Sequence, residues 1–233
     1  MSKSKLSTYI LLDRSGSMSG AKWDSSISSI NEYVGTLRAD GTKGKVTIAA
    51  FDGSGINSAG WSKRGGAGHL QTKENLNFTV LRDEKTISKF NNLKSSEIDP
   101  RGSTPLYDAT AQLLNMAEEN NGEKTIILIM TDGYENSSTI YNNQSIRDRL
   151  KTCERRGWEV VFLGAEFNND KVAQDLGFKL DKVINTRNAN QLGDTMQFYA
   201  KSASAYSTNG EAINTTKMRT ELDKEDKPTL SNS

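Results

Sequence analysis

The chain has 233 residues, of which 34% are hydrophobic, and its 30 basic and 29 acidic residues leave a formal net charge of +1. A chain of this length can bury the core of one α/β domain of about 200 residues together with a short appendage. A nearly neutral chain has no overall field that would attract nucleic acid or a membrane surface, so neither is expected as a partner. Any partner has to be inferred from a local site.

No segment predicts a leader or a membrane span. Few apolar residues separate Met1 from Asp13, too few for the core of a signal peptide, and the longest apolar run, TIILIM at 125–130, is much shorter than a membrane-spanning helix. The single cysteine, Cys153, excludes an internal disulfide and a cysteine metal cluster. We therefore expect a soluble, cytoplasmic protein.

The first part of the chain alternates between predicted strand and predicted helix. The apolar segment LSTYILL at 6–12 predicts a buried strand that ends at Asp13. Apolar residues spaced three and four apart over 23–37 predict an amphipathic helix. KVTIAAFDG at 45–53 predicts a second strand, which also ends near an aspartate, Asp52. Aspartates at strand ends are often turn or cap residues, so Asp52 is left outside the candidate site.

A stretch rich in glycine, serine and lysine at 53–75 has no sustained periodicity and predicts a long loop inserted into the domain. It lacks the Gly-Lys-Ser/Thr ending of a phosphate-binding P-loop. NLNFTVL at 75–81 predicts an edge strand after it. Thr104 followed by Pro105 predicts an N-cap and the first residue of a helix.

The second half of the chain continues the alternation. Its predicted elements are a strand at 125–130, a helix at 146–153, a strand at 158–165, a helix at 170–177, a strand at 182–186 and a helix at 192–206. Strands alternating with helices predict an α/β fold with a doubly wound, mostly parallel central sheet and helices on both faces.

Composition divides the chain into a domain and a tail. Residues 1–206 hold the predicted strands and helices, with 53–75 as the inserted loop. Residues 207–233 are charged and poor in apolar side chains. We expect this tail to be largely disordered, with a marginal helix near 217–224 as the alternative.

Oxygen-bearing side chains gather where the predicted parallel strands end. Asp13 and Asp132 follow two such strands, and Thr104 opens a helix that should begin at the same edge of the sheet. Ser15 and Ser17 alternate with Asp13, which places the side chains toward one side of an extended or turning backbone. Alone, the LLDRSGSMSG segment fits a turn, a phosphate loop or a metal site. The full set of oxygen donors suits Mg²⁺, with Mn²⁺ as a substitute, whereas zinc would require histidine or cysteine.

Three segments together resemble the metal-ion-dependent adhesion site of the von Willebrand factor A domain family. They are DRSGS at 13–17, GSTPLYDA at 102–109 and MTDG at 130–133, in that order. The resemblance extends over roughly residues 5–206. It implies a doubly wound sheet with one short antiparallel edge strand and a Mg²⁺ ion at its top.

The resemblance also implies a role for each candidate residue. Ser15, Ser17 and Thr104 would contact the metal directly, and Asp13 and Asp132 would act largely through water. An aspartate or glutamate carboxylate of a partner protein would occupy the sixth coordination position of the ion. Because neutral hydroxyl ligands leave most of the ion's charge toward the open position, an external carboxylate would be strongly attracted. The implied function is a Mg²⁺-dependent protein-protein interaction module that is not an enzyme.

Other functions stay open at this point. A metal-dependent phosphohydrolase would also place carboxylates around Mg²⁺, but position 15 is serine where the common aspartyl-phosphate hydrolases have a second aspartate, and no lysine or histidine adjoins the motif. A third reading is an assembly component that works in trans with an ATPase or a stress-response complex. The resemblance favours a bacterial or bacteriophage protein, and family analogy suggests that the helix at 192–206 slides when a ligand binds. The oligomeric state is not predicted.

Overall fold

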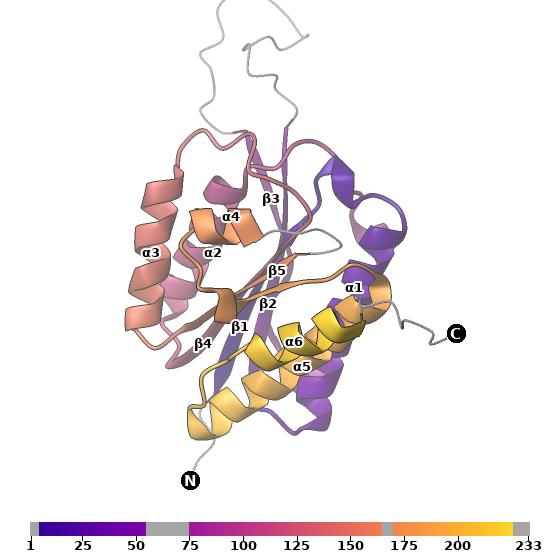
Figure 1. Ribbon diagram of the computed structural model, residues 1–233, viewed down its shortest axis with the longest axis vertical. Helices are drawn as coiled ribbons and strands as arrows, with labels where there is room; N and C mark the ends of the chain where they lie inside the picture. Colours follow the sequence, from indigo (N-terminus) through magenta and orange to yellow (C-terminus); the bar gives the residue numbers. More distant parts are fainter. Residues whose placement is uncertain (1–4, 55–74, 165–169, 226–233) are drawn as a thin grey trace, which may run out of the picture.

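The computed structural model describes residues 5–54, 75–164 and 170–225 (Figure 1). A six-stranded sheet lies at its centre, in the order β3-β2-β1-β4-β5-β6. The strands are β1 Leu6–Asp13, β2 Gly44–Gly53, β3 Leu76–Thr86, β4 Lys124–Thr131, β5 Glu159–Gly164 and β6 Val183–Asn185. All neighbours pair in parallel except β2 and β3, which are antiparallel. The predicted fold class is confirmed, although β3 is 11 residues long and therefore not a short strand.

Helices cover both faces of this sheet (Figure 1). The longer ones are α1 Ala21–Ala39, α2 Leu106–Asn120, α3 Asn143–Arg155, α4 Asp170–Asp175, α5 Ala189–Asn209 and α6 Thr216–Glu225. The short 3-10 turns are η1 Gly16–Met18, η2 Ile87–Lys89, η3 Ser95–Glu97 and η4 Leu180–Lys182. α1, α5 and α6 pack on one face, and α2, α3 and α4 pack on the other. Among the described residues, no helix is both long and apolar enough to cross a bilayer.

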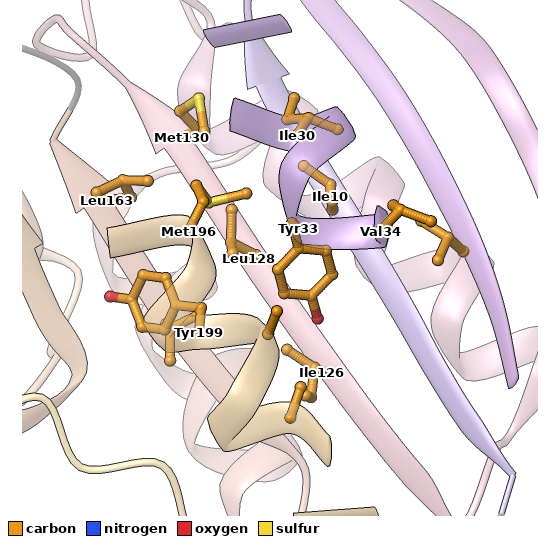
Figure 2. Packing of buried hydrophobic residues seen from close by; sticks show 14 of the residues in the cluster. Ile10, Ile30, Tyr33, Val34, Ile126, Leu128, Met130, Leu163, Met196 and Tyr199 are labelled. Atoms are coloured by element: carbon orange, nitrogen blue, oxygen red, sulfur yellow. The ribbon is translucent and has the colours of Figure 1, made fainter. Parts of the chain in front are cut away.

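The core has two layers because side chains alternate along each buried strand. In β1, Ile10 points into the layer under α1 and α5, whereas Leu11 points into the layer under α2 and α3. Figure 2 shows the first layer, in which Tyr33 of α1 and Tyr199 of α5 flank Leu128 of β4. These side chains are at most 1% exposed, so the strands that carry the candidate site rest on a closely packed base.

The prediction of a disordered tail is wrong for residues 207–225, where the structure has the helix near 217–224 that was the alternative. Helix α5 continues to Asn209, and α6 follows at Thr216–Glu225. Ile213, Met218 and Leu222 are each at most 8% exposed and join the core layer under α1 and α5. The many charges concealed this narrow apolar stripe, because average composition does not register three well-placed side chains. The remainder of the predicted tail, 226–233, lies outside the described residues, as does 55–74 of the predicted loop.

Candidate metal centre

The candidate site lies at the carboxyl ends of β1 and β4. These two strands are neighbours although they are not consecutive in the chain, so the helices that follow them cover opposite faces. Such a change of direction opens a crevice at the sheet edge where ligands commonly bind in open α/β sheets. β1 ends at Asp13, and β4 ends at Thr131, directly before Asp132.

Asp13 is fully buried at the end of β1. One carboxylate oxygen accepts the Ser15 N–H at 2.7 Å, and the other accepts the Thr131 hydroxyl at 2.6 Å. Burial raises the pKa of Asp13 to about 6, a rise that these hydrogen bonds oppose and that the charge of Asp132 adds to. The carboxylate is therefore fixed in orientation and costly to ionise, and a nearby cation would stabilise its charged form.

A chain of hydrogen bonds joins the loop after β1 to the loop after β4. The hydroxyl oxygens of Ser15 and Ser17 lie 3.0 Å apart and share a hydrogen bond. The Ser17 hydroxyl then donates to Oδ1 of Asp132 at 2.7 Å. Side chains from positions 115 residues apart therefore meet at one point, as the strand-end positions predicted.

Thr104 faces the same space from a third loop. A Cβ placed on Gly133 would lie 3.6 Å from the Thr104 hydroxyl oxygen and 3.8 Å from that of Ser17, so both oxygens lie beside this glycine. The Thr104 N–H donates to the Asn136 side chain at 2.8 Å, which fixes the loop. The predicted N-cap role of Thr104 is wrong, because α2 begins at Leu106 with Pro105 as its cap residue.

Sequence reasoning missed Lys22. Its ammonium group donates to Oδ2 of Asp132 at 2.5 Å, so the expectation that no lysine adjoins the motif is wrong. Lys22 lies in the first turn of α1, and that turn points its side chain back toward the motif. The position of Lys22, at the start of the helix that follows the Asp13–Ser17 segment, was the sequence signal that could have predicted this contact.

Two carboxylates hold the loop after β4: Glu135 within the loop and Asp108 of α2. Oε1 of Glu135 accepts the Ser137 N–H at 2.7 Å, and the Asp108 carboxylate accepts the Tyr141 N–H at 2.7 Å. Asp108 of α2 therefore has a structural role, because its carboxylate holds this loop. The fixed loop exposes half of Tyr134 beside Asp132.

The donor set fits a hard divalent cation. In the part of the chain that the structure describes, no three histidine, cysteine, aspartate or glutamate side chains are grouped so that they could hold a metal. A metal here would therefore depend on hydroxyl oxygens together with the carboxylates of Asp13 and Asp132. Such all-oxygen ligation suits Mg²⁺ or Mn²⁺, whereas zinc prefers nitrogen and sulfur.

Solved structures of several proteins share this fold. The von Willebrand factor domain of the type V pili tip protein Mfa5 from Porphyromonas gingivalis has a TM-score of 0.61 and 11% identity, over 91% of this chain and 99% of that one. Manganese-loaded TRAP protein from Plasmodium vivax has a TM-score of 0.55 and 15% identity, over 82% of this chain and 72% of that one. The PilB minor pilin from Streptococcus sanguinis has a TM-score of 0.56 and 13% identity, over 97% of this chain. The chain spans 64% of the length of that pilin.

These low identities show a common fold and no more. Comparison with curated protein sequences gives no match. A sequence model of the von Willebrand factor type A domain, however, matches residues 8–198, which is most of the chain. The chain therefore belongs to the von Willebrand factor type A domain family.

Proposed function

We propose that this domain is a Mg²⁺-dependent protein-interaction module. Ser15, Ser17 and Thr104 would hold the ion, with Asp13 and Asp132 acting largely through water, and Mn²⁺ would substitute for Mg²⁺. The observation that carries the proposal is the convergence of oxygen donors from three loops: the Ser17 and Thr104 hydroxyl oxygens lie beside Gly133, and Ser17 is hydrogen-bonded to both Ser15 and Asp132. Oxygen donors spread over separate loops suit octahedral Mg²⁺, which retains part of its water shell.

The proposed ligand is an aspartate or glutamate carboxylate of a partner protein. Two features support it. The direct ligands are neutral, and the nearest carboxylates already interact with other donors: Asp13 accepts two hydrogen bonds, and Asp132 is paired with Lys22. The ion would therefore keep a strong positive field toward solvent, where it would attract an external carboxylate.

Two of the solved structures with this fold are consistent with the proposed function. One solved structure with this fold is described as manganese-loaded, and another belongs to a pilus tip protein. A domain that binds partners through an ion fits both descriptions. A cytoplasmic location and a bacterial or bacteriophage host remain parts of the proposal, and an assembly component that works in trans with an ATPase or a stress-response complex remains an alternative to it.

Capture of partners with and without the ion tests the proposal. The wild-type domain is immobilised in Mg²⁺ or in EDTA, and bound proteins are identified by mass spectrometry. The proposal expects partners that elute with EDTA and are lost by a Ser15→Ala/Ser17→Ala bait. The matched control is Ser25→Ala/Ser28→Ala, two serines on α1, which should bind as the wild type does. Equal capture by the site variant and the control would contradict the proposal.

One observation favours a phosphohydrolase as the second candidate. Lys22 lies against Asp132, so an ammonium group that could neutralise a phosphate is present at the site. A panel of phosphate esters assayed with Mg²⁺ separates the two functions. Turnover that Asp13→Ala abolishes would support the enzyme, and its absence across the panel would support the binding module.

A further inference from the structure

The carboxyl end of β2 contacts two of the loops that form the candidate site, although it supplies none of the proposed ligands. Asp52, which is fully buried there, accepts hydrogen bonds on both carboxylate oxygens. Nη2 of Arg14 donates to one oxygen at 3.1 Å, and Nε of Arg101 donates to the other at 2.9 Å. Arg14 lies between Asp13 and Ser15, and Arg101 lies three residues before Thr104.

Backbone hydrogen bonds repeat the same connection. The Arg101 N–H donates to the Arg14 carbonyl oxygen at 2.7 Å, and the Gly16 N–H donates to the Gly102 carbonyl oxygen at 3.2 Å. The Gly53 N–H, next to Asp52, donates to the Ser103 carbonyl oxygen at 2.8 Å. The loop with the serines, the loop with the threonine and the end of β2 therefore form one hydrogen-bonded unit.

Two glycines allow the backbones of this unit to approach each other closely. A Cβ on Gly53 would lie 1.9 Å from the Ser103 hydroxyl oxygen, and a Cβ on Gly102 would lie 2.1 Å from the Gly53 carbonyl oxygen. Gly102 also has a φ of +72°, a conformation that other residues rarely adopt. The backbone at Gly53, next to Asp52, is thus in direct contact with the loop that carries Thr104. A change in the Asp52 carboxylate would therefore be transmitted to Thr104.

Charge makes Asp52 the central member of the unit. The side chains of Asp52 and Arg14 are 0% and 4% exposed, so this ion pair is removed from water. Arg14 also donates to the Asp99 carbonyl oxygen at 3.1 Å, which binds its guanidinium to the loop that precedes Thr104. Without the Asp52 charge, two guanidinium groups would lie close together with no shared carboxylate, and they would repel each other and any nearby cation.

We propose that Asp52 is a positioning residue of the metal site. It would not touch the ion, but would hold the loop of Thr104 against the loop of Ser15 and Ser17, so that all three hydroxyl oxygens reach the ion together. This role rests on the proposed function. It adds a residue from a strand that the sequence motif does not include.

The test is Mn²⁺ binding by Asp52→Asn, which keeps the side-chain shape and removes its charge. Electron paramagnetic resonance gives the affinity, and water-proton relaxation gives the number of water molecules on the bound ion. We expect the affinity to fall by about tenfold to a hundredfold, as for other groups that orient metal ligands. Because a withdrawn Thr104 oxygen would be replaced by solvent, we expect about one more water on the ion.

Two further variants separate positioning from general stability. Leu222→Ala removes a buried side chain of α6, so it should lower the melting temperature but leave the Mn²⁺ affinity and hydration unchanged. Arg101→Gln removes only the ion pair between Asp52 and Arg101. Because the Arg101 side chain is 65% exposed, this variant should fold even if Asp52→Asn does not. It should weaken Mn²⁺ binding less than Asp52→Asn, with a change of hydration in the same direction.

The outcomes distinguish this role from the proposed function. If the wild type binds Mn²⁺ and both Asp52→Asn and Arg101→Gln keep its affinity and hydration, the positioning role is wrong and the metal site stands. If Leu222→Ala loses affinity as much as Asp52→Asn does, the effect is one of stability and the role is again wrong. If the wild type binds no Mn²⁺, the proposed function fails and this role fails with it.

Discussion

Replacing Asp13 with asparagine should stabilise the metal-free protein at neutral pH. The pKa of Asp13 rises from 3.8 to about 6 in the folded chain, a rise of about two units. Because the pKa of Asp13 is higher in the folded state, the folded state holds the proton more tightly than the unfolded state does. Stability is therefore lost as the pH rises from about 3.8 to about 6. At about 1.4 kcal/mol per unit, ionised Asp13 costs about 3 kcal/mol of folding free energy at neutral pH.

Asparagine removes this cost but supplies only one acceptor oxygen for two donors. Losing the hydrogen bond to either Ser15 or Thr131 costs about 1 kcal/mol, so the expected net gain is about 1–2 kcal/mol. The gain should also depend on pH. Between about pH 5 and about pH 7.5 it should grow by about 1 kcal/mol, since the wild type loses stability over that range and the variant does not.

The assay is urea unfolding in EDTA, followed by tryptophan fluorescence at both pH values. Asp24→Asn, which removes an exposed carboxylate of α1, is the control for the loss of a carboxylate. In Mg²⁺ the order should reverse, because only the wild type gains stability from the ion. The reasoning is refuted if Asp13→Asn is less stable than the wild type in EDTA by the same amount at both pH values.

The remaining predictions concern other parts of the chain. Lys22→Met removes a cation 2.5 Å from Asp132 and should tighten Mg²⁺ binding severalfold in calorimetry, and an unchanged or weaker affinity would contradict the competition between the two cations. Burial raises the pKa of the Cys153 thiol to about 11, so at about pH 8 its reaction with a disulfide reagent should be about a hundredfold slower in the folded protein than in urea, and equal rates would show that it is accessible. Leu222→Ala should lower the free energy of unfolding by about 2 kcal/mol, whereas no loss would mean that α6 is not packed in solution.

The fold could be predicted from the sequence because its strands and helices have clear periodicities. The uninterrupted apolar run of β4 predicted a strand covered on both faces, and both of its faces are buried. The strand ends at Asp13 and Thr131 then located the edge of the sheet where polar loops meet. The positions of the oxygen-bearing residues then predicted the candidate site, because residues at the ends of neighbouring parallel strands have to lie close together.

The features that sequence reasoning missed depend on contacts between distant residues. Asp52 resembled an ordinary turn residue, since its arginine partners lie 38 and 49 residues away in opposite directions. Lys22 was overlooked because only the first turn of α1 directs it back to Asp132. Met218 of α6 was overlooked among its charged neighbours, because its burial depends on contacts of α6 with α5 and β6, which its own sequence pattern does not show.

The most direct test of the central claim is calorimetric titration of Mg²⁺ into the wild type and into Ser15→Ala/Ser17→Ala, with Ser25→Ala/Ser28→Ala as the control. We predict that the wild type and the control each bind one ion, and that the site variant loses affinity by at least about tenfold. No binding to the wild type, or equal binding to all of these proteins, would contradict the claim that the serines hold a metal ion.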